Sequence, residues 1–276
     1  MFKLSKFPVV SSLILICSLS FVSLGSAEDV NKTDVDLFYQ KYATISDVTP
    51  AEPSQNKFRE EVITPNIERS TTIPIYDESG NLVSEFQLDK NIDVESKASA
   101  LQTGKLVNVL VAVDEEYRSA HSDWTTLVSS YLESADDPFN QEFSIDLNIA
   151  AYRLWYSDGN NASALLSNLK GAGTDTYDLV IGFTGETDID GGGQGYIYAS
   201  KPPYAGYSFV TNQSATGQIH ALQHEVSHNY GLDHDATAST PSCIMNYGTM
   251  YYTTVWHSDH HNQLGVRRLW YGTTVN

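Results

Sequence analysis

Residues 224–235, with the sequence HEVSHNYGLDHD, place three imidazole rings and a carboxylate at spacings that one metal ion can use. His224 and His228 are four positions apart, so on a helix they lie on one face about 6 Å from each other. A continuing helix would carry His234 away from them, but Gly231 can adopt positive φ as a helix C-cap and let the chain reverse. The spacing therefore predicts three nitrogen ligands for a single zinc ion, which leaves the open fourth position of a catalytic site.

Glu225 follows the first of these histidines and points about 100° around the helix, where it can reach the water rather than the metal. Zinc lowers the pKa of a bound water toward about 7, and a nearby carboxylate can take its proton and pass it to a leaving amine. We therefore expect Glu225 to be the general base of peptide hydrolysis. His220 offers a rival metal set with His224 and His228, but a straight helix spreads these three rings over two turns, so we expect His220 to pack.

The same residues carry a resemblance to a known family. HEVSHNYGLDH matches H-E-x-x-H-x-x-G-x-x-H, the pattern of the metzincin zinc endopeptidases, which chance would produce in about two such chains in a hundred thousand. Residues 243–247, CIMNY, resemble the metzincin Met-turn. The resemblance implies that Met245 forms a hydrophobic floor under the three histidines, and a compatible order of elements extends over residues 104–276.

Two residues resemble different subfamilies. Asp235, directly after the third histidine, resembles the reprolysin (adamalysin-like) group, in which such an Asp supports the Met-turn. Tyr247 resembles the tyrosine of astacins and serralysins, which can bind zinc and stabilise the oxyanion. We expect a reprolysin-like protein in which Tyr247 donates a hydrogen bond to the developing tetrahedral oxygen. Ordinary packing roles for Met245 and Tyr247 stay open as alternatives.

The resemblance also implies an edge strand above the cleft, where an extended substrate pairs through its main chain. Residues 194–199 are the candidate for this strand. The glycine-rich loop before it could form a flexible rim of the cleft. Its acidic residues Glu186, Asp188 and Asp190 could instead bind calcium, although their spacing does not fit an EF-hand.

A second group of polar residues lies near the C-terminus: His257, Asp259, His260 and His261. These side chains could bind another metal ion. The alternative is the polar start of a final helix that runs to Trp270, with Asp259 as its N-cap, and we expect this helix.

Alternating strand and helix patterns surround these motifs. Buried-strand patterns cover residues 105–113, 143–156, 177–184, 195–199 and 207–211. Helices are expected at 162–170, at about 216–230, and after the cap Asp114 on a face made of Tyr117, Ala120, Trp124, Leu127 and Tyr131. The order predicts an α/β (α+β metzincin-like) fold with a twisted, mostly parallel sheet, an antiparallel edge strand, a long active-site helix, a Met-turn and a C-terminal helix.

The first residues predict export. Lys3 and Lys6 precede an apolar stretch and then small residues, so residues 1–27 are expected to be a cleaved signal peptide, with an uncleaved membrane anchor as the alternative. Cleavage would leave Cys243 as the one cysteine of the mature chain. Stability must then come from packing and bound metal rather than from disulfides.

Residues 28–103 resemble a metzincin propeptide by position and size, and they contain a hairpin pattern at residues 71–88. This segment has no cysteine, which excludes a cysteine switch as its means of latency. The alternative is a segment that stays attached as a stabilising or binding module. Residues 104–276 are expected to form the metzincin-like catalytic domain.

Length and charge limit the partners. The chain has 276 residues, of which 41% are hydrophobic, so it can bury a globular core. Its net charge of −18 argues against binding to nucleic acid. We predict a secreted zinc-dependent endopeptidase that acts on proteins or peptides and has no stable membrane association after signal cleavage. A catalytically silent zinc-binding adhesion protein and a zinc aminopeptidase are the alternatives.

Overall fold

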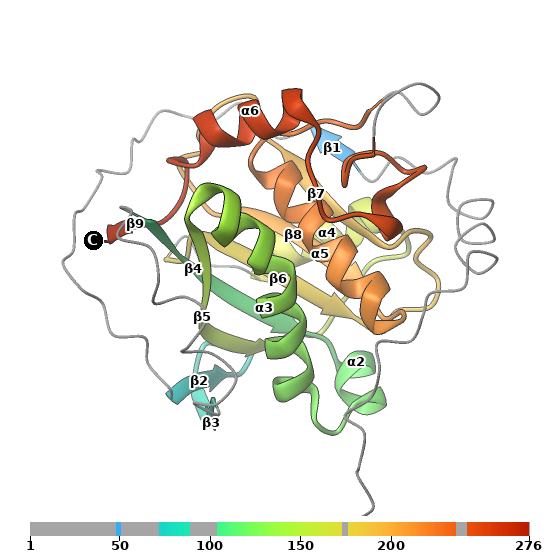
Figure 1. Ribbon diagram of the computed structural model, residues 1–276. Coiled ribbons are helices and arrows are strands. Elements are labelled where there is room, and N and C mark those ends of the chain that lie inside the picture. Colours follow the sequence, from blue (N-terminus) through green and yellow to red (C-terminus); the bar gives the residue numbers. More distant parts are fainter. Residues whose placement is uncertain (1–47, 51–71, 89–103, 173–175, 236–241, 276) are drawn as a thin grey trace, which may run out of the picture.

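The structure is a computed structural model that describes residues 48–50, 72–88, 104–172, 176–235 and 242–275 (Figure 1). The predicted signal peptide and most of the predicted N-terminal segment lie outside the described residues. Within the described part of the chain, no helix is long and apolar enough to cross a membrane.

One nine-stranded sheet organises the described residues. Its strands, in sheet order, are β1 (Val48–Pro50), β7 (Gly193–Ile197), β8 (Gly206–Thr211), β6 (Leu179–Thr184), β4 (Gly104–Val113), β5 (Ile145–Leu154), β2 (Thr72–Tyr76) and β3 (Leu82–Gln87), and β9 (Thr273–Val275) also pairs with β4. The pairs β7–β8, β2–β3 and β4–β9 are antiparallel, and the other neighbours are parallel. The predicted mixed α/β fold with a mostly parallel sheet is confirmed.

Helices cover both faces of the sheet (Figure 1). The helices are α2 (Glu115–Ala120), α3 (Trp124–Phe143), α4 (Ala162–Ala172), α5 (Ala215–Asn229) and α6 (Ser258–Arg267), with a short 3₁₀ turn at Met250–Tyr252. Successive side chains of a strand point to opposite faces, and β4 buries both. Its Val109 and Val111 join the apolar cluster under α3 and α5, whereas Leu110 and Ala112 join the cluster under α4. This double burial explains the continuous apolar run of the central strand.

The predicted helix after Asp114 is divided in two. Asp114 caps α2 as predicted, since its carboxylate accepts a hydrogen bond from the Tyr117 amide at 2.8 Å. The chain becomes extended at His121, and α3 then begins after Asp123. The break lets Tyr117 donate a hydrogen bond to Gln218 on α5 while α3 packs against β5. The predicted single apolar face was therefore wrong.

Two predicted boundaries were also wrong. The strand expected from Phe143 begins at Ile145, because Phe143 ends α3 and Ser144 adopts a φ of 53°. The N-cap of α6 is His257 rather than Asp259, because the His257 ring accepts a hydrogen bond from the Asp259 amide. The expected final helix exists, but it ends at Arg267.

Parts of the predicted N-terminal segment extend this sheet at both ends (Figure 1). The hairpin of β2 and β3 continues it beyond β5, with Ile75 opposite Tyr152. At the other end, β1 runs parallel to β7, with Val48 opposite Gly195. The antiparallel strand β7, which carries most of the predicted substrate-binding edge, therefore has β1 along its outer side.

Candidate metal centre

Helix α5 carries the first two histidines of the motif, is capped at its start and is hydrogen-bonded to the sheet near its end. The Ser214 hydroxyl caps its start by accepting a hydrogen bond from the Gly217 amide at 3.1 Å. Near its end, the Asn229 side-chain amide donates hydrogen bonds to the carbonyls of Tyr196 on β7 and Tyr207 on β8, at 3.1 and 3.0 Å. The helix therefore holds its side chains in a fixed position relative to the two strands.

The chain reverses after α5 through a Schellman motif. The Gly231 amide donates to the carbonyl of His228 at 2.7 Å, and the Leu232 amide donates to the carbonyl of Ser227 at 3.1 Å. Gly231 has a φ of +82°. A Cβ there would lie 2.5 Å from the carbonyl oxygen of Tyr198, so the backbone conformation and the surrounding space both require glycine.

This reversal brings His234 back to the two helical histidines. The Nε2 atoms of His224, His228 and His234 are 3.0 Å apart in each of the three pairs. His224 and His228 are fully buried, and His234 is partly exposed. The three nitrogens, which come from residues spread over positions 224–234, therefore converge, and the partly exposed His234 is on the surface side of the group.

In two of the rings, a hydrogen bond to a backbone carbonyl determines which nitrogen can bind a metal ion. His224 Nδ1 lies 2.8 Å from the Ile244 carbonyl, and His228 Nδ1 lies 2.7 Å from the Leu232 carbonyl. Because a carbonyl can only accept, each Nδ1 carries the proton of the neutral ring, and each Nε2 presents a lone pair. Metal-binding histidines typically donate such a hydrogen bond from the ring nitrogen that does not bind the metal.

The three nitrogens fit a zinc ion. Zinc–nitrogen bonds of 2.0–2.1 Å in tetrahedral coordination place neighbouring nitrogens about 3.3 Å apart. The spacing of 3.0 Å between the Nε2 atoms is within a few tenths of an ångström of that value. Nitrogen donors of neutral imidazole are also ligands that zinc prefers.

Glu225 lies beside these histidines, against two glycines of β7. The residue is 2% exposed and is not part of the convergent histidine group. A Cβ on Gly193 would lie 3.0 Å from Glu225 Oε1, and a Cβ on Gly195 would lie 3.2 Å from Oε2. The two glycines alternate on one face of the strand and leave the space that the carboxylate occupies. Sequence reasoning missed this role because it placed Gly193 in the loop before the predicted strand, whereas the strand begins at Gly193.

The predicted Met-turn is joined to the same centre. Cys243, Ile244 and Met245 are fully buried in the apolar cluster under α5. The Ile244 carbonyl is the partner of His224, and the Met245 carbonyl accepts a hydrogen bond from the Asp235 amide at 3.0 Å. The turn is therefore hydrogen-bonded both to His224 on α5 and to Asp235, the residue that follows His234.

Tyr247, at the end of the Met-turn, lies against two of the histidine rings. Its ring centroid is 4.4 Å from that of His234 and 5.8 Å from that of His224. The side chain is partly exposed.

Other polar residues lie apart from the convergent group. His220 Nδ1 makes a hydrogen bond to the Met250 carbonyl at 2.7 Å, and burial lowers the pKa of its ring. This agrees with the expected packing role. The described residues contain two groups that could hold a metal ion, and Glu186, Asp188 and Asp190 belong to neither.

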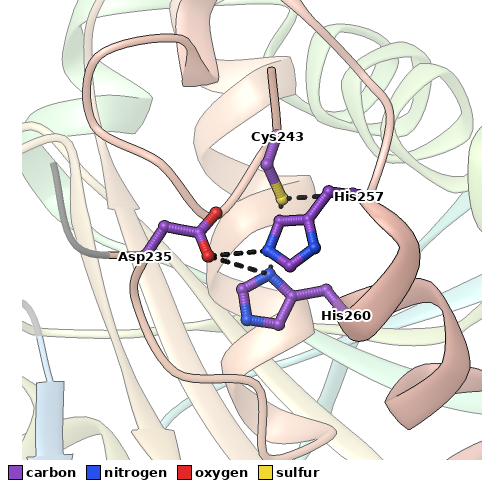
Figure 2. A group of neighbouring side chains, drawn as sticks. All are labelled: Asp235, Cys243, His257 and His260. Carbon is purple, nitrogen blue, oxygen red and sulfur yellow. Dashed lines mark hydrogen bonds and ion pairs between the residues drawn. The ribbon is translucent and has the colours of Figure 1, made fainter. Parts of the chain in front are cut away.

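The four polar residues at positions 257–261 separate into different roles. Asp259 lies in the first turn of α6, and His261 contacts Glu142 at 3.2 Å. His257 and His260 instead face Asp235 and Cys243, and these four residues form the second candidate metal group (Figure 2). We call them the Asp235 cluster. Sequence reasoning weighed a metal ion here but missed two of the four partners.

Comparisons with known proteins place the chain in a family. No curated protein matches it significantly. One chain of a solved structure described as "Structure of a chaperone-substrate complex" aligns at 16% identity with a TM-score of 0.46, over 61% of this chain and 36% of that chain. The model of metallo-peptidase family M12, in its reprolysin form, matches residues 103–260, which are more than half of the chain and include the whole histidine motif. This chain therefore belongs to metallo-peptidase family M12 and is a reprolysin-like metallopeptidase.

Proposed function

We propose that the protein is a secreted endopeptidase that holds one catalytic zinc ion with His224, His228 and His234. The observation that carries this proposal is the convergence of the three Nε2 atoms at 3.0 Å from one another. The hydrogen bonds from Nδ1 to backbone carbonyls support it, because they leave two of these Nε2 atoms unprotonated. Three protein ligands leave room for substrate in the fourth position.

Zinc bound at these nitrogens would polarise the scissile carbonyl and make water acidic near neutral pH. The protein's own contribution begins with Glu225, whose carboxylate accepts the proton of the attacking water and then gives it to the leaving amine. Burial against the glycines of β7 supports this role, because it restricts the carboxylate to one position. A base fixed in this way needs no reorganisation at the moment of reaction.

Tyr247 is proposed to stabilise the oxygen of the scissile carbonyl as negative charge develops on it. Its ring lies 4.4 Å from the His234 ring, close enough for its hydroxyl to serve the same reacting group. A hydrogen bond from a phenol that is stronger in the transition state than in the ground state raises kcat rather than affinity.

The substrate is proposed to lie along β7 as an added strand. The outer side of β7 is occupied by β1, which belongs to the predicted propeptide. Val48 of β1 is opposite Gly195, the residue that packs against Glu225 and His228. We therefore propose that residues 28–103 are a propeptide that blocks this edge. The hairpin at β2 and β3 supports a stabilising role for its later part, because it pairs with β5.

A cleavage site for a specific protease, inserted between β1 and β2, would test the propeptide. If β1 blocks the substrate edge, cutting the full chain there increases peptide hydrolysis. Hydrolysis that is unchanged by complete cutting would favour a segment that remains attached as a module.

Export has a separate test. If the signal peptide is cleaved after residue 27, N-terminal sequencing of the mature protein should begin at Glu28.

Glu225→Gln tests the general base. We expect it to keep the bound zinc and to lower kcat by about 10²–10⁴-fold, the usual contribution of a positioned acid–base group. Glu116→Gln, at an exposed residue of α2 in the predicted catalytic domain, is the matched control and should have wild-type activity. Undiminished hydrolysis in Glu225→Gln would refute the assignment.

The products from a peptide library distinguish the proposed activity from its alternatives. Internal cuts would support an endopeptidase, and terminal products would support an aminopeptidase. The absence of any product would support the silent binding protein.

A further inference from the structure

The Asp235 cluster joins three segments around the predicted active site. Asp235 directly follows His234, Cys243 begins the Met-turn, and His257 and His260 come from the cap and first turn of α6. Figure 2 shows the four side chains pointing toward one another from these segments. One potential ligand atom from each lies within 4.8 Å of the others.

The cluster is buried and holds a mixed set of donor atoms. Cys243 is fully buried, His260 is 5% exposed, and the Asp235 side chain is 7% exposed. His260 Nδ1 lies 3.4 Å from Cys243 Sγ and 3.7 Å from Asp235 Oδ1. Tetrahedral zinc places a sulfur and a nitrogen ligand about 3.5 Å apart. Sulfur, imidazole nitrogen and carboxylate oxygen are all ligands of zinc.

The backbone around Cys243 provides donors for the sulfur. The backbone amides of Met245 and His257 both point at Sγ, at 3.4 and 3.5 Å. Because thiolate is the form of cysteine that binds a metal ion, an ion bound here would displace the thiol proton, and the two amides would stabilise the resulting thiolate.

The positions of the protons distinguish the two histidines. His257 Nδ1 accepts a hydrogen bond from the Asp259 amide at 3.2 Å, so the neutral ring carries its proton on Nε2. That nitrogen lies 2.7 Å from Asp235 Oδ1 and donates to it. His257 therefore has no lone pair for a metal and instead holds the carboxylate in place, as the outer partners of ligating carboxylates do.

The second oxygen of Asp235 accepts no hydrogen bond of ordinary geometry. Oδ2 is buried and has no hydrogen-bond partner among the described residues. A buried carboxylate oxygen without a partner is strongly unfavourable, and a cation can supply what is missing. In Figure 2 the carboxylate is directed at the side chains of the other segments rather than away from them.

We propose that Asp235, Cys243 and His260 bind a second zinc ion, and that His257 is a positioning residue for Asp235. The ion would cross-link the segment after His234, the Met-turn and α6. It would thereby provide the kind of cross-link that a disulfide provides in other exported proteins, since a mature chain with one cysteine cannot form an internal disulfide. The proposal does not depend on peptidase activity, because none of these side chains belongs to the convergent histidine group.

The test is metal content and cobalt absorption of the full chain. Two zinc ions per chain are expected, and replacement by cobalt(II) should produce a near-ultraviolet charge-transfer band between sulfur and cobalt. The convergent histidine group contains no sulfur, so the band reports on the Asp235 cluster alone. Cys243→Ser should lose the band and one equivalent of metal. His261→Ala, on the same helix but outside the cluster, should keep both.

The wild-type chain alone can decide the outcome, even if a variant fails to fold. A single equivalent of metal with no sulfur-to-cobalt band would overturn the proposal, and so would two equivalents without the band. A single equivalent with the band would support the second site and contradict the proposed catalytic site. The failure of either proposal is therefore distinguishable from the failure of the other.

Discussion

The two histidine-containing groups differ in how their donor atoms are prepared. In the convergent group, three identical nitrogens lie 3.0 Å apart, and backbone carbonyls hold the protons of two rings on the opposite side. In the Asp235 cluster, the two rings lie 2.7 and 3.7 Å from Asp235 Oδ1, and the His257 ring already donates its proton to the carboxylate. The convergent group has the equal nitrogen spacing that one ion needs. The side chains of the Asp235 cluster also hydrogen-bond to one another without an ion.

The two groups are also adjacent along the backbone. His234 and Asp235 are consecutive, and Ile244, whose carbonyl holds His224, follows Cys243. A cross-link at the Asp235 cluster would therefore fix the backbone on which the convergent group depends. Under the two proposals, peptide hydrolysis takes place at the convergent group, and the Asp235 cluster stabilises the backbone around it.

The largest expected effect comes from His228→Ala. Loss of one of three ligands should lower peptide hydrolysis by at least about 10³-fold, because polarisation by a metal ion is worth several kcal/mol. The Asp235 cluster should keep its metal and its cobalt band. His220→Ala, on the same helix, is the control and should keep both activity and metal. Loss of the cobalt band in His228→Ala would show that the two groups are not separate sites.

Tyr247→Phe should lower kcat by about 10²-fold and leave KM and both metal equivalents unchanged, because only a hydrogen bond to the transition state is lost. Steady-state kinetics on a peptide substrate measures this. Tyr156→Phe, an exposed tyrosine, is the control. An unchanged kcat would assign Tyr247 to packing.

Gly231→Ala should affect both groups, since the reversal at Gly231 leads directly to His234 and Asp235. The φ of +82° and the 2.5 Å approach to the Tyr198 carbonyl predict a loss of at least about 1–3 kcal/mol in the free energy of unfolding. Denaturant unfolding measures it. Gly171→Ala in α4 is the control, because an added Cβ there meets no atom within 4 Å. Equal stability of the two variants would contradict the strain argument.

The sequence predicted the parts of the molecule that depend on local pattern. The spacing of His224 and His228, with Gly231 after them, was enough to expect the reversal that the structure contains. The buried strands β4 and β6 also follow from their apolar runs. The reprolysin-like family predicted from the motif is confirmed by the match over residues 103–260.

Features that depend on distant partners were not predictable in this way. The apolar period from Tyr117 to Tyr131 continues across the break between α2 and α3, so periodicity could not reveal it. Polar residues near position 260 were correctly expected to start a helix, but Asp235 and Cys243 reach them only through the fold. No local pattern shows that Asp235 and Cys243, which precede His260 by 25 and 17 positions, will lie against its side chain.

The smallest expected effect distinguishes support from ligation within the Asp235 cluster. Asparagine is a good N-cap, so His257→Asn should preserve the start of α6 while removing the hydrogen bond to Asp235. Loss of such an outer partner usually weakens metal binding by about 10–100-fold. We therefore expect two metal equivalents at saturation, an intact cobalt band and a weaker second binding step in a chelator competition. Complete loss of the band would make His257 a ligand, and an unchanged affinity would show that Asp235 needs no positioning.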